Sequence, residues 1–90
     1  MDISSIRETE AVEYRITRSK LIMAGISSAG YDALCAILEL EFRSDGQVWR
    51  FYDVPEHVWY DFRKTEAGDS FFHTNISGKY IARQIEKGMQ

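Results

Sequence analysis

Residues that could carry acid–base, metal or nucleophilic chemistry are few and far apart in this chain of 90 residues. His57 and His73 lie sixteen positions apart, and neither has a second histidine at the spacing of a metal site. Cys35 is the single cysteine, so it cannot form an internal disulfide, and its apolar neighbours predict a buried, unreactive thiol. These residues therefore predict no metal site and no cofactor.

Acidic side chains in the middle of the chain could be interpreted as a pair of catalytic carboxylates. Turns and helix caps explain Asp45, Asp53 and Glu56 better, because short acidic side chains accept backbone N–H groups there. Asp61 is expected on the exposed side of a helix. We therefore predict that the protein is not an enzyme.

The aromatic stretch Trp49-Arg50-Phe51-Tyr52 offers clearer binding chemistry. In a strand, side chains alternate between the two faces, so Trp49 and Phe51 share one face and Arg50 and Tyr52 the other. The first pair could be a stacking platform for RNA bases or the core face of a sheet. We favour the core, because so small a domain needs its large aromatics inside. Arg50 and Tyr52 then become candidate surface contacts.

Basic residues recur every fourth position near the end of the chain, at Lys79, Arg83 and Lys87. If residues 80–87 form a helix, these side chains line one face and could contact phosphates, with Tyr80 beside them. The alternative, which we favour, is an ordinary solvated helix face.

A hairpin must position the aromatic stretch. Two apolar runs meet across Ser44-Asp45-Gly46, and Asp-Gly readily adopts the positive φ of a tight turn. The run from Leu34 to Phe42 alternates as a half-buried strand does, and Pro55 fits the start of a helix that extends to about residue 64.

The other elements are less regular. Residues 1–20 predict a helical turn from Ser5, then a strand, and we treat them as an N-terminal extension to a domain over residues 21–90. Gly30-Tyr31-Asp32 is interpreted as a turn, and Phe71-Phe72 as the start of a short helical segment.

The overall composition is that of one ordinary globular domain, with 44% hydrophobic and 28% charged residues. The net charge of −3 lacks the basic excess that is typical of nucleic-acid-binding proteins. Neither a signal peptide nor an apolar stretch of about 20 residues is present, so we expect a cytoplasmic protein with no membrane partner.

Several ordered motifs resemble the KTSC domain, a small module named for its occurrence at the C-terminus of some lysyl-tRNA synthetases. The motifs are Ile26-Ser27-Ser28-Ala29-Gly30-Tyr31-Asp32, Leu38-Glu39-Leu40-Glu41-Phe42, Val54-Pro55, Gly68-Asp69-Ser70-Phe71-Phe72 and Asn75-Ile76-Ser77-Gly78-Lys79-Tyr80. The resemblance implies an α+β fold of bacteria and phages, with a small antiparallel sheet of three to four strands, a central hairpin and one or two short helices. Trp49-Arg50-Phe51 replaces the Tyr-x-Tyr of the family, and the first 20 residues lie outside the resemblance.

Two functions remain open at this point. The resemblance implies a small non-catalytic binding module that contacts RNA or tRNA, and its candidate contacts are Arg50, Tyr52, Lys79, Tyr80 and Arg83. The alternative is a protein–protein adaptor, of bacterial or phage origin, or a homodimer, and the acidic net charge fits this alternative better.

Overall fold

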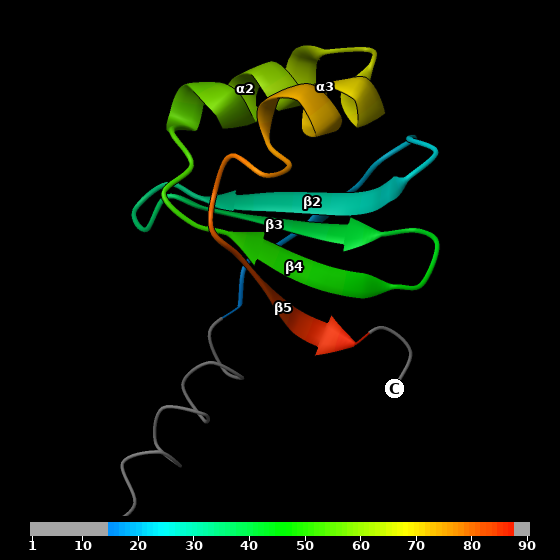
Figure 1. The fold of residues 1–90 in the computed structure, drawn as a ribbon, viewed down its shortest axis with the longest axis horizontal. Helices are drawn as coiled ribbons and strands as arrows, with labels where there is room; N and C mark the ends of the chain where they lie inside the picture. Colours follow the sequence, from blue (N-terminus) through cyan, green and yellow to red (C-terminus); the bar gives the residue numbers. More distant parts are fainter. Residues whose placement is uncertain (1–14, 88–90) are drawn as a thin grey trace, which may run out of the picture.

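The computed structural model describes residues 15–87 and has an α+β architecture, with an antiparallel sheet covered on one face by two helices (Figure 1). The strands are arranged in the sheet in the same order as in the sequence. Both helices come between the last two strands in the sequence, and those two strands are neighbours in the sheet. The strands are β1 (Ser19–Lys20), β2 (Ile26–Asp32), β3 (Ile37–Phe42), β4 (Gln47–Phe51) and β5 (Ala82–Lys87), and the helices are α2 (Glu56–Lys64) and α3 (Gly68–Asn75). The predicted fold class is confirmed, although the described sheet has five strands rather than three to four.

The predicted hairpin and the first predicted helix are both confirmed. β3 and β4 pair across a turn in which Gly46 has a φ of 72°, and the Asp45 carboxylate accepts the Gln47 N–H at 3.1 Å. Pro55 precedes α2 with a φ of −63°, which suits the entry to a helix. Local turn chemistry was therefore sufficient to locate both elements.

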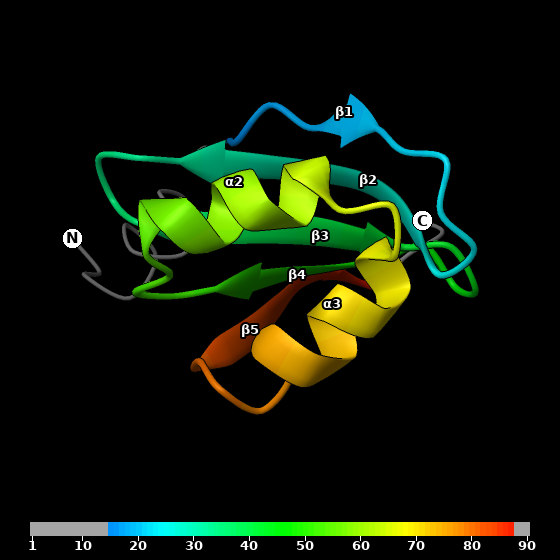
Figure 2. The same ribbon diagram turned by 90° about the horizontal axis from the view of Figure 1, so that it is seen from above.

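The core lies between the helices and the near face of the sheet. Figure 2 shows α2 above β2 and β3, and α3 towards β4 and β5. Leu38 and Leu40 of the sheet and Phe62 of α2 are fully buried. Phe72 of α3 packs edge-on against Phe51, with ring centroids 5.7 Å apart. Apolar burial on this one face supplies the main driving force for the fold.

The interpretation of residues 30–32 as a turn is wrong, because Gly30 and its neighbours continue β2. The chain turns at residues 33–36 instead, where the Asp32 carboxylate accepts the N–H groups of Leu34 and Cys35. β3 consequently begins at Ile37 rather than Leu34. The predicted burial of Cys35 is also wrong, since its position in this turn leaves it exposed.

The chain after α3 also differs from the prediction. Residues 82–87 form strand β5 and not a helix, because they complete the hydrogen bonding of β4 along its outer side. A spacing of four residues places side chains on one face of a strand as well as of a helix, so the recurrence of basic residues could not separate the two. The short helical segment expected at Phe71 is α3, which begins three residues earlier.

The far face of the sheet is polar and holds a buried ion-pair network. Glu39 is only 2% exposed, and its carboxylate is paired with the guanidinium groups of Arg50, at 2.8 Å, and of Arg18. Ser28 donates a hydrogen bond of 2.8 Å to Glu41, which lowers the pKa of that carboxyl. The prediction of Arg50 as a surface contact is wrong, because the side chain is 5% exposed and satisfies a buried acid.

Residues 15–18, the N-terminal strap, lie against this far face. Ile16 is buried, and the carbonyl oxygen of Thr17 would be 2.1 Å from any Cβ atom at residue 30, so only Gly30 allows the strap to pass. The strap leads into β1, which pairs with β2. The helical turn predicted from Ser5 and most of the strand predicted after it lie outside the described residues.

Replacing Gly30 by alanine should displace the N-terminal strap. Backbone atoms of Thr17 cannot give way as a flexible side chain would, so we expect the free energy of unfolding to fall by about 1 to 3 kcal/mol. Trypsin should also cleave faster after Arg18, because that residue loses its contacts with Ser28 and Glu39. Unchanged cleavage at Arg18 would show that the strap does not depend on Gly30. Gly78→Ala is the control for the cleavage only: a Cβ atom there has no neighbour within 4 Å, and its cost in stability arises from the positive φ of its own turn, so cleavage after Arg18 should not change.

Replacing Glu39 by glutamine should destabilise the domain strongly. The substitution preserves the shape of the side chain but removes the carboxylate charge that pairs with the buried guanidinium of Arg50, at a cost of about 3 kcal/mol. Glu41→Gln, two positions along the same strand face, should cost less than about 1 kcal/mol, since Glu41 is half-buried and its main partner is a hydroxyl. Urea unfolding measures the free energy of unfolding of both variants. Equal losses of stability would contradict a special role for Glu39.

Candidate functional site

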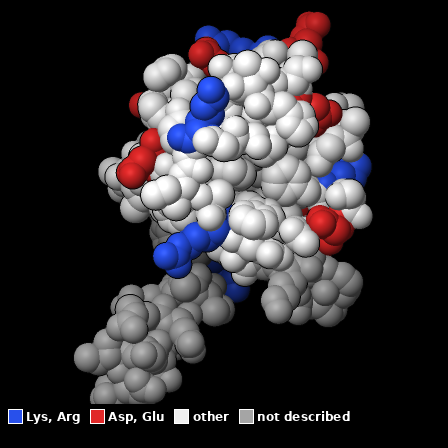
Figure 3. All heavy atoms as spheres, in the orientation of Figure 1, with Lys and Arg blue, Asp and Glu red and all other residues white. Residues whose placement is uncertain are grey.

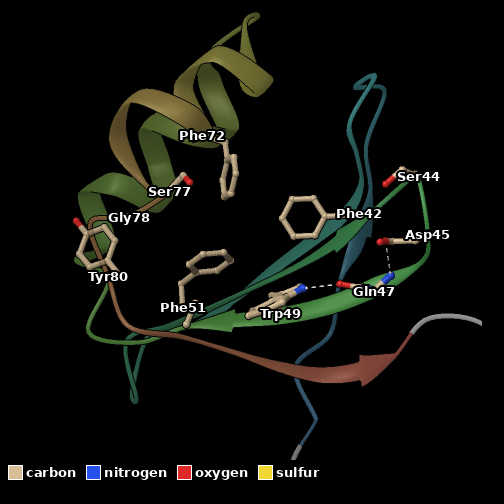
Figure 4. Close-up of a pocket in the computed structure, with 11 residues that line it drawn as sticks. Phe42, Ser44, Asp45, Gln47, Trp49, Phe51, Phe72, Ser77, Gly78 and Tyr80 are labelled. Atoms are coloured by element: carbon tan, nitrogen blue, oxygen red, sulfur yellow. Dashed lines mark hydrogen bonds between the residues drawn. The ribbon is translucent and has the colours of Figure 1, made fainter.

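A groove of about 380 Å³ opens between α3 and the end of the sheet formed by β4 and β5 (Figure 4). Five of its side chains are aromatic and come from four different parts of the chain. We call it the aromatic groove, and its lining residues are Phe42, Ser44, Asp45, Gln47, Trp49, Phe51, Phe72, Ser77, Gly78, Tyr80 and Ala82.

Strand β4 forms the floor of the aromatic groove. Its alternation places Trp49 and Phe51 on the face that carries the helices, as the sequence predicted. Phe51 is 5% exposed and belongs to the core, whereas Trp49 is half-buried at the open side. The indole Nε1–H of Trp49 donates to the Gln47 side-chain oxygen at 3.0 Å, which fixes the orientation of the ring.

The turn after α3 forms a wall of the aromatic groove. The N–H of Lys79 donates to the Ile76 carbonyl at 3.0 Å, and Gly78 between them has a φ of 76°. A positive φ at the third residue of a turn favours glycine over every other residue. This turn carries Ser77 and Gly78 to the groove and places Tyr80 at its end, opposite the hairpin.

The hairpin end of the groove is polar. Ser44, Asp45 and Gln47 lie there, and Asp45 is the one charged residue among the side chains that line the groove. Figure 3 shows the corresponding face of the molecule, where a wide uncharged area is bordered by scattered basic and acidic side chains. The groove therefore combines aromatic walls with a single negative charge.

The structure separates the five residues that the sequence proposed as binding contacts, and it brings one of them, Tyr80, beside the two residues of the possible stacking platform. Trp49, Phe51 and Tyr80 meet in the aromatic groove. Arg83 lies directly opposite Arg50 in the β4–β5 ladder, so both side chains belong to the far face of the sheet. The remaining two residues are Lys79, which is exposed on the turn, and Tyr52, which is half-buried just beyond β4.

Sequence reasoning missed several lining residues. Phe42 shares the alternating face of Leu38 and Leu40, so its approach to β4 could have been inferred from the hairpin. The position of Phe72 depends on how α3 packs on the sheet, for which the sequence holds no local signal. Asp45 was assigned only to the turn, and it serves both the turn and the groove.

Two further observations concern other kinds of site. Among residues 15–87, no group of three or more histidine, cysteine, aspartate or glutamate side chains is arranged to hold a metal ion. No helix within the described part of the chain has the length and apolar character to cross a membrane.

Comparison with known proteins found one matching family model and a similar solved structure. A sequence model of the KTSC domain matches residues 24–80, which include every lining residue of the groove except Ala82. The crystal structure of a KTSC domain protein from Yersinia pestis is similar, with a TM-score of 0.76 and 30% sequence identity. That similarity covers 80% of this chain and 100% of the other. No curated protein sequence matches the chain significantly.

Substitution of Gly78 tests how the turn shapes the groove. We expect Gly78→Ala to lower the free energy of unfolding by about 1 kcal/mol, because the cost arises from the positive φ and not from a steric clash. Gly78→Asn should cost less, since asparagine tolerates this conformation better. Thermal unfolding of the two variants measures the difference, and an alanine variant as stable as the parent protein would contradict the requirement.

Proposed function

The chain belongs to the KTSC domain family, and on this premise we propose that it is a non-catalytic module that binds a protein partner through the aromatic groove. The proposal rests on the lining of the groove. It includes five aromatic side chains, and no described lysine or arginine side chain belongs to it. Protein interfaces favour such partly exposed aromatic pockets as the place where one anchoring side chain is buried.

The size of the groove supports a single anchor. A volume of about 380 Å³ is at the lower end of the range for pockets that enclose a ligand, and it suits one large side chain. The walls are already ordered, because Phe51 and Phe72 belong to the core and Trp49 is held by Gln47. A partner would therefore lose little free energy to ordering this surface, which favours binding.

Binding of single-stranded RNA is the second candidate, and the half-buried ring of Trp49 is the observation that favours it. An aromatic side chain in such a position can stack on an unpaired base. The cations expected to hold phosphates are not gathered around the groove, however. Arg50 is paired with Glu39, and Arg83 lies on the far face of the sheet. We therefore rank the protein partner first.

A direct test uses a displayed library of random twelve-residue peptides, selected on the purified protein. The Trp59→Phe variant leaves Trp49 as the one tryptophan of the chain, so its fluorescence reports on the groove. We expect the selected peptides to change the fluorescence of Trp49. Trp49→Ala, made in the parent sequence, should weaken the binding of the same peptides about thirtyfold, as loss of an interface anchor site does. Calorimetry measures the affinities.

Two controls accompany this test. Tyr60→Ala removes an exposed aromatic side chain of α2 that lies outside the groove and should leave the peptide affinity unchanged. Titration with oligouridylate and with tRNA at low and at physiological salt examines the second candidate. Salt-sensitive RNA binding, together with the absence of any peptide that depends on Trp49, would overturn the protein proposal.

A further inference from the structure

We propose that the anchor which the groove accepts is an arginine side chain of the partner protein, a proposal that rests on the function proposed above. The faces of aromatic rings carry negative electrostatic potential, and five such rings line the groove. Asp45 adds a full negative charge at the hairpin end, and no described lysine or arginine side chain lines the groove to neutralise it. This combination favours a cation with an apolar stem over an anion or a neutral ligand.

Asp45 is held in a position to receive such a group. One carboxylate oxygen accepts the N–H of Gln47 at 3.1 Å, so the side chain is fixed by its own turn. The second oxygen accepts no hydrogen bond from any residue that the structure describes, and the residue is exposed to solvent. An incoming donor can therefore reach this oxygen without displacing an existing interaction.

The two ends of the groove suit the two parts of an arginine side chain. Phe51, Phe72 and Tyr80 surround one end, and Trp49, Gln47 and Asp45 lie at the other (Figure 4). The methylene stem can pack on the phenyl rings while the guanidinium reaches the indole and the carboxylate. The planar guanidinium suits this end better than a lysine ammonium does, because it stacks on aromatic faces and donates two parallel hydrogen bonds.

The second tryptophan of the chain shows the same chemistry within the domain. The guanidinium carbon of Arg63 lies 5.5 Å from the centre of the Trp59 ring on α2. Trp49 has no such cation over its ring among the described residues. Gln47 holds the indole of Trp49 in place, and the tryptophan ring can therefore contact a group from outside the domain.

Synthetic peptide pools of the form X4-Z-X4 test the proposal, where X is a random residue other than arginine or lysine and Z is arginine, citrulline, lysine or leucine. Citrulline has the shape of arginine without the charge. We expect the arginine pool to bind about ten times more tightly than the citrulline and leucine pools, and several times more tightly than the lysine pool. Binding is measured by Trp49 fluorescence in the Trp59→Phe variant and by calorimetry.

Asp45→Asn is the matched variant. Asparagine preserves the oxygen that caps the turn, and Asn-Gly forms the hairpin as well as Asp-Gly does, so the melting temperature should hardly change. We expect the preference for arginine over citrulline to fall at least threefold in this variant. Asp61→Asn removes the same charge from an exposed residue of α2 outside the groove, and it should leave the preference unaltered.

The outcomes separate this inference from the function on which it rests. If the leucine or citrulline pool binds as tightly as the arginine pool, and Trp49→Ala abolishes all binding, the groove binds proteins but the arginine anchor is overturned. If no pool binds in a manner that depends on Trp49, both proposals are overturned. If the arginine preference survives unchanged in Asp45→Asn, the carboxylate is not its source and the inference fails.

Discussion

A buried carboxylate sets the register of the central hairpin. Glu39 and Arg50 face each other across β3 and β4, and this pairing also places Leu38 opposite Phe51 and Leu40 opposite Trp49. A slip of β4 by one residue would turn Arg50 towards the helices, away from Glu39, and Trp49 and Phe51 towards the far face. Buried ion pairs contribute little net stability by themselves, but a misplaced one is very costly. The pair therefore excludes alternative registers, and the aromatic groove exists only in the register that it selects.

The two faces of the sheet are consequently covered in different ways. The near face is covered by α2 and α3 (Figure 2). The groove is lined by residues of α3, of the turn that follows it and of β4 (Figure 4). On the far face, Arg18 of the N-terminal strap supplies the second counter-charge of Glu39. The strap and β5 lie outside residues 24–80, the segment that the family model matches. Residues 24–80 therefore carry every lining residue of the groove except Ala82, while the strap and β5 complete the polar face and the sheet edge.

Features that depend on neighbouring residues could be predicted from the sequence, whereas features that depend on contacts between distant parts of the chain could not. Asp45-Gly46 and Pro55 act on their own backbone, so the hairpin and the start of α2 could be located from the sequence. The alternation of β4 likewise separated Trp49 from Arg50. The position of Gly30 in a strand could not be predicted, because the close approach that requires it comes from Thr17, thirteen residues away. The burial of Arg50 depends on Glu39 across the ladder, which no local pattern reports.

The basic residues of the domain explain why a count of charges predicts its binding surface poorly. Arg43 donates to the backbone carbonyl groups of Leu21 and Met23 and so holds the segment before β2. Arg18 and Arg50 neutralise Glu39, and Arg63 lies over Trp59. These four guanidinium groups make their contacts within the domain itself. The electrostatic character of the groove is then determined by what lines it, namely aromatic faces and the carboxylate of Asp45, and the proposed arginine anchor rests on this character.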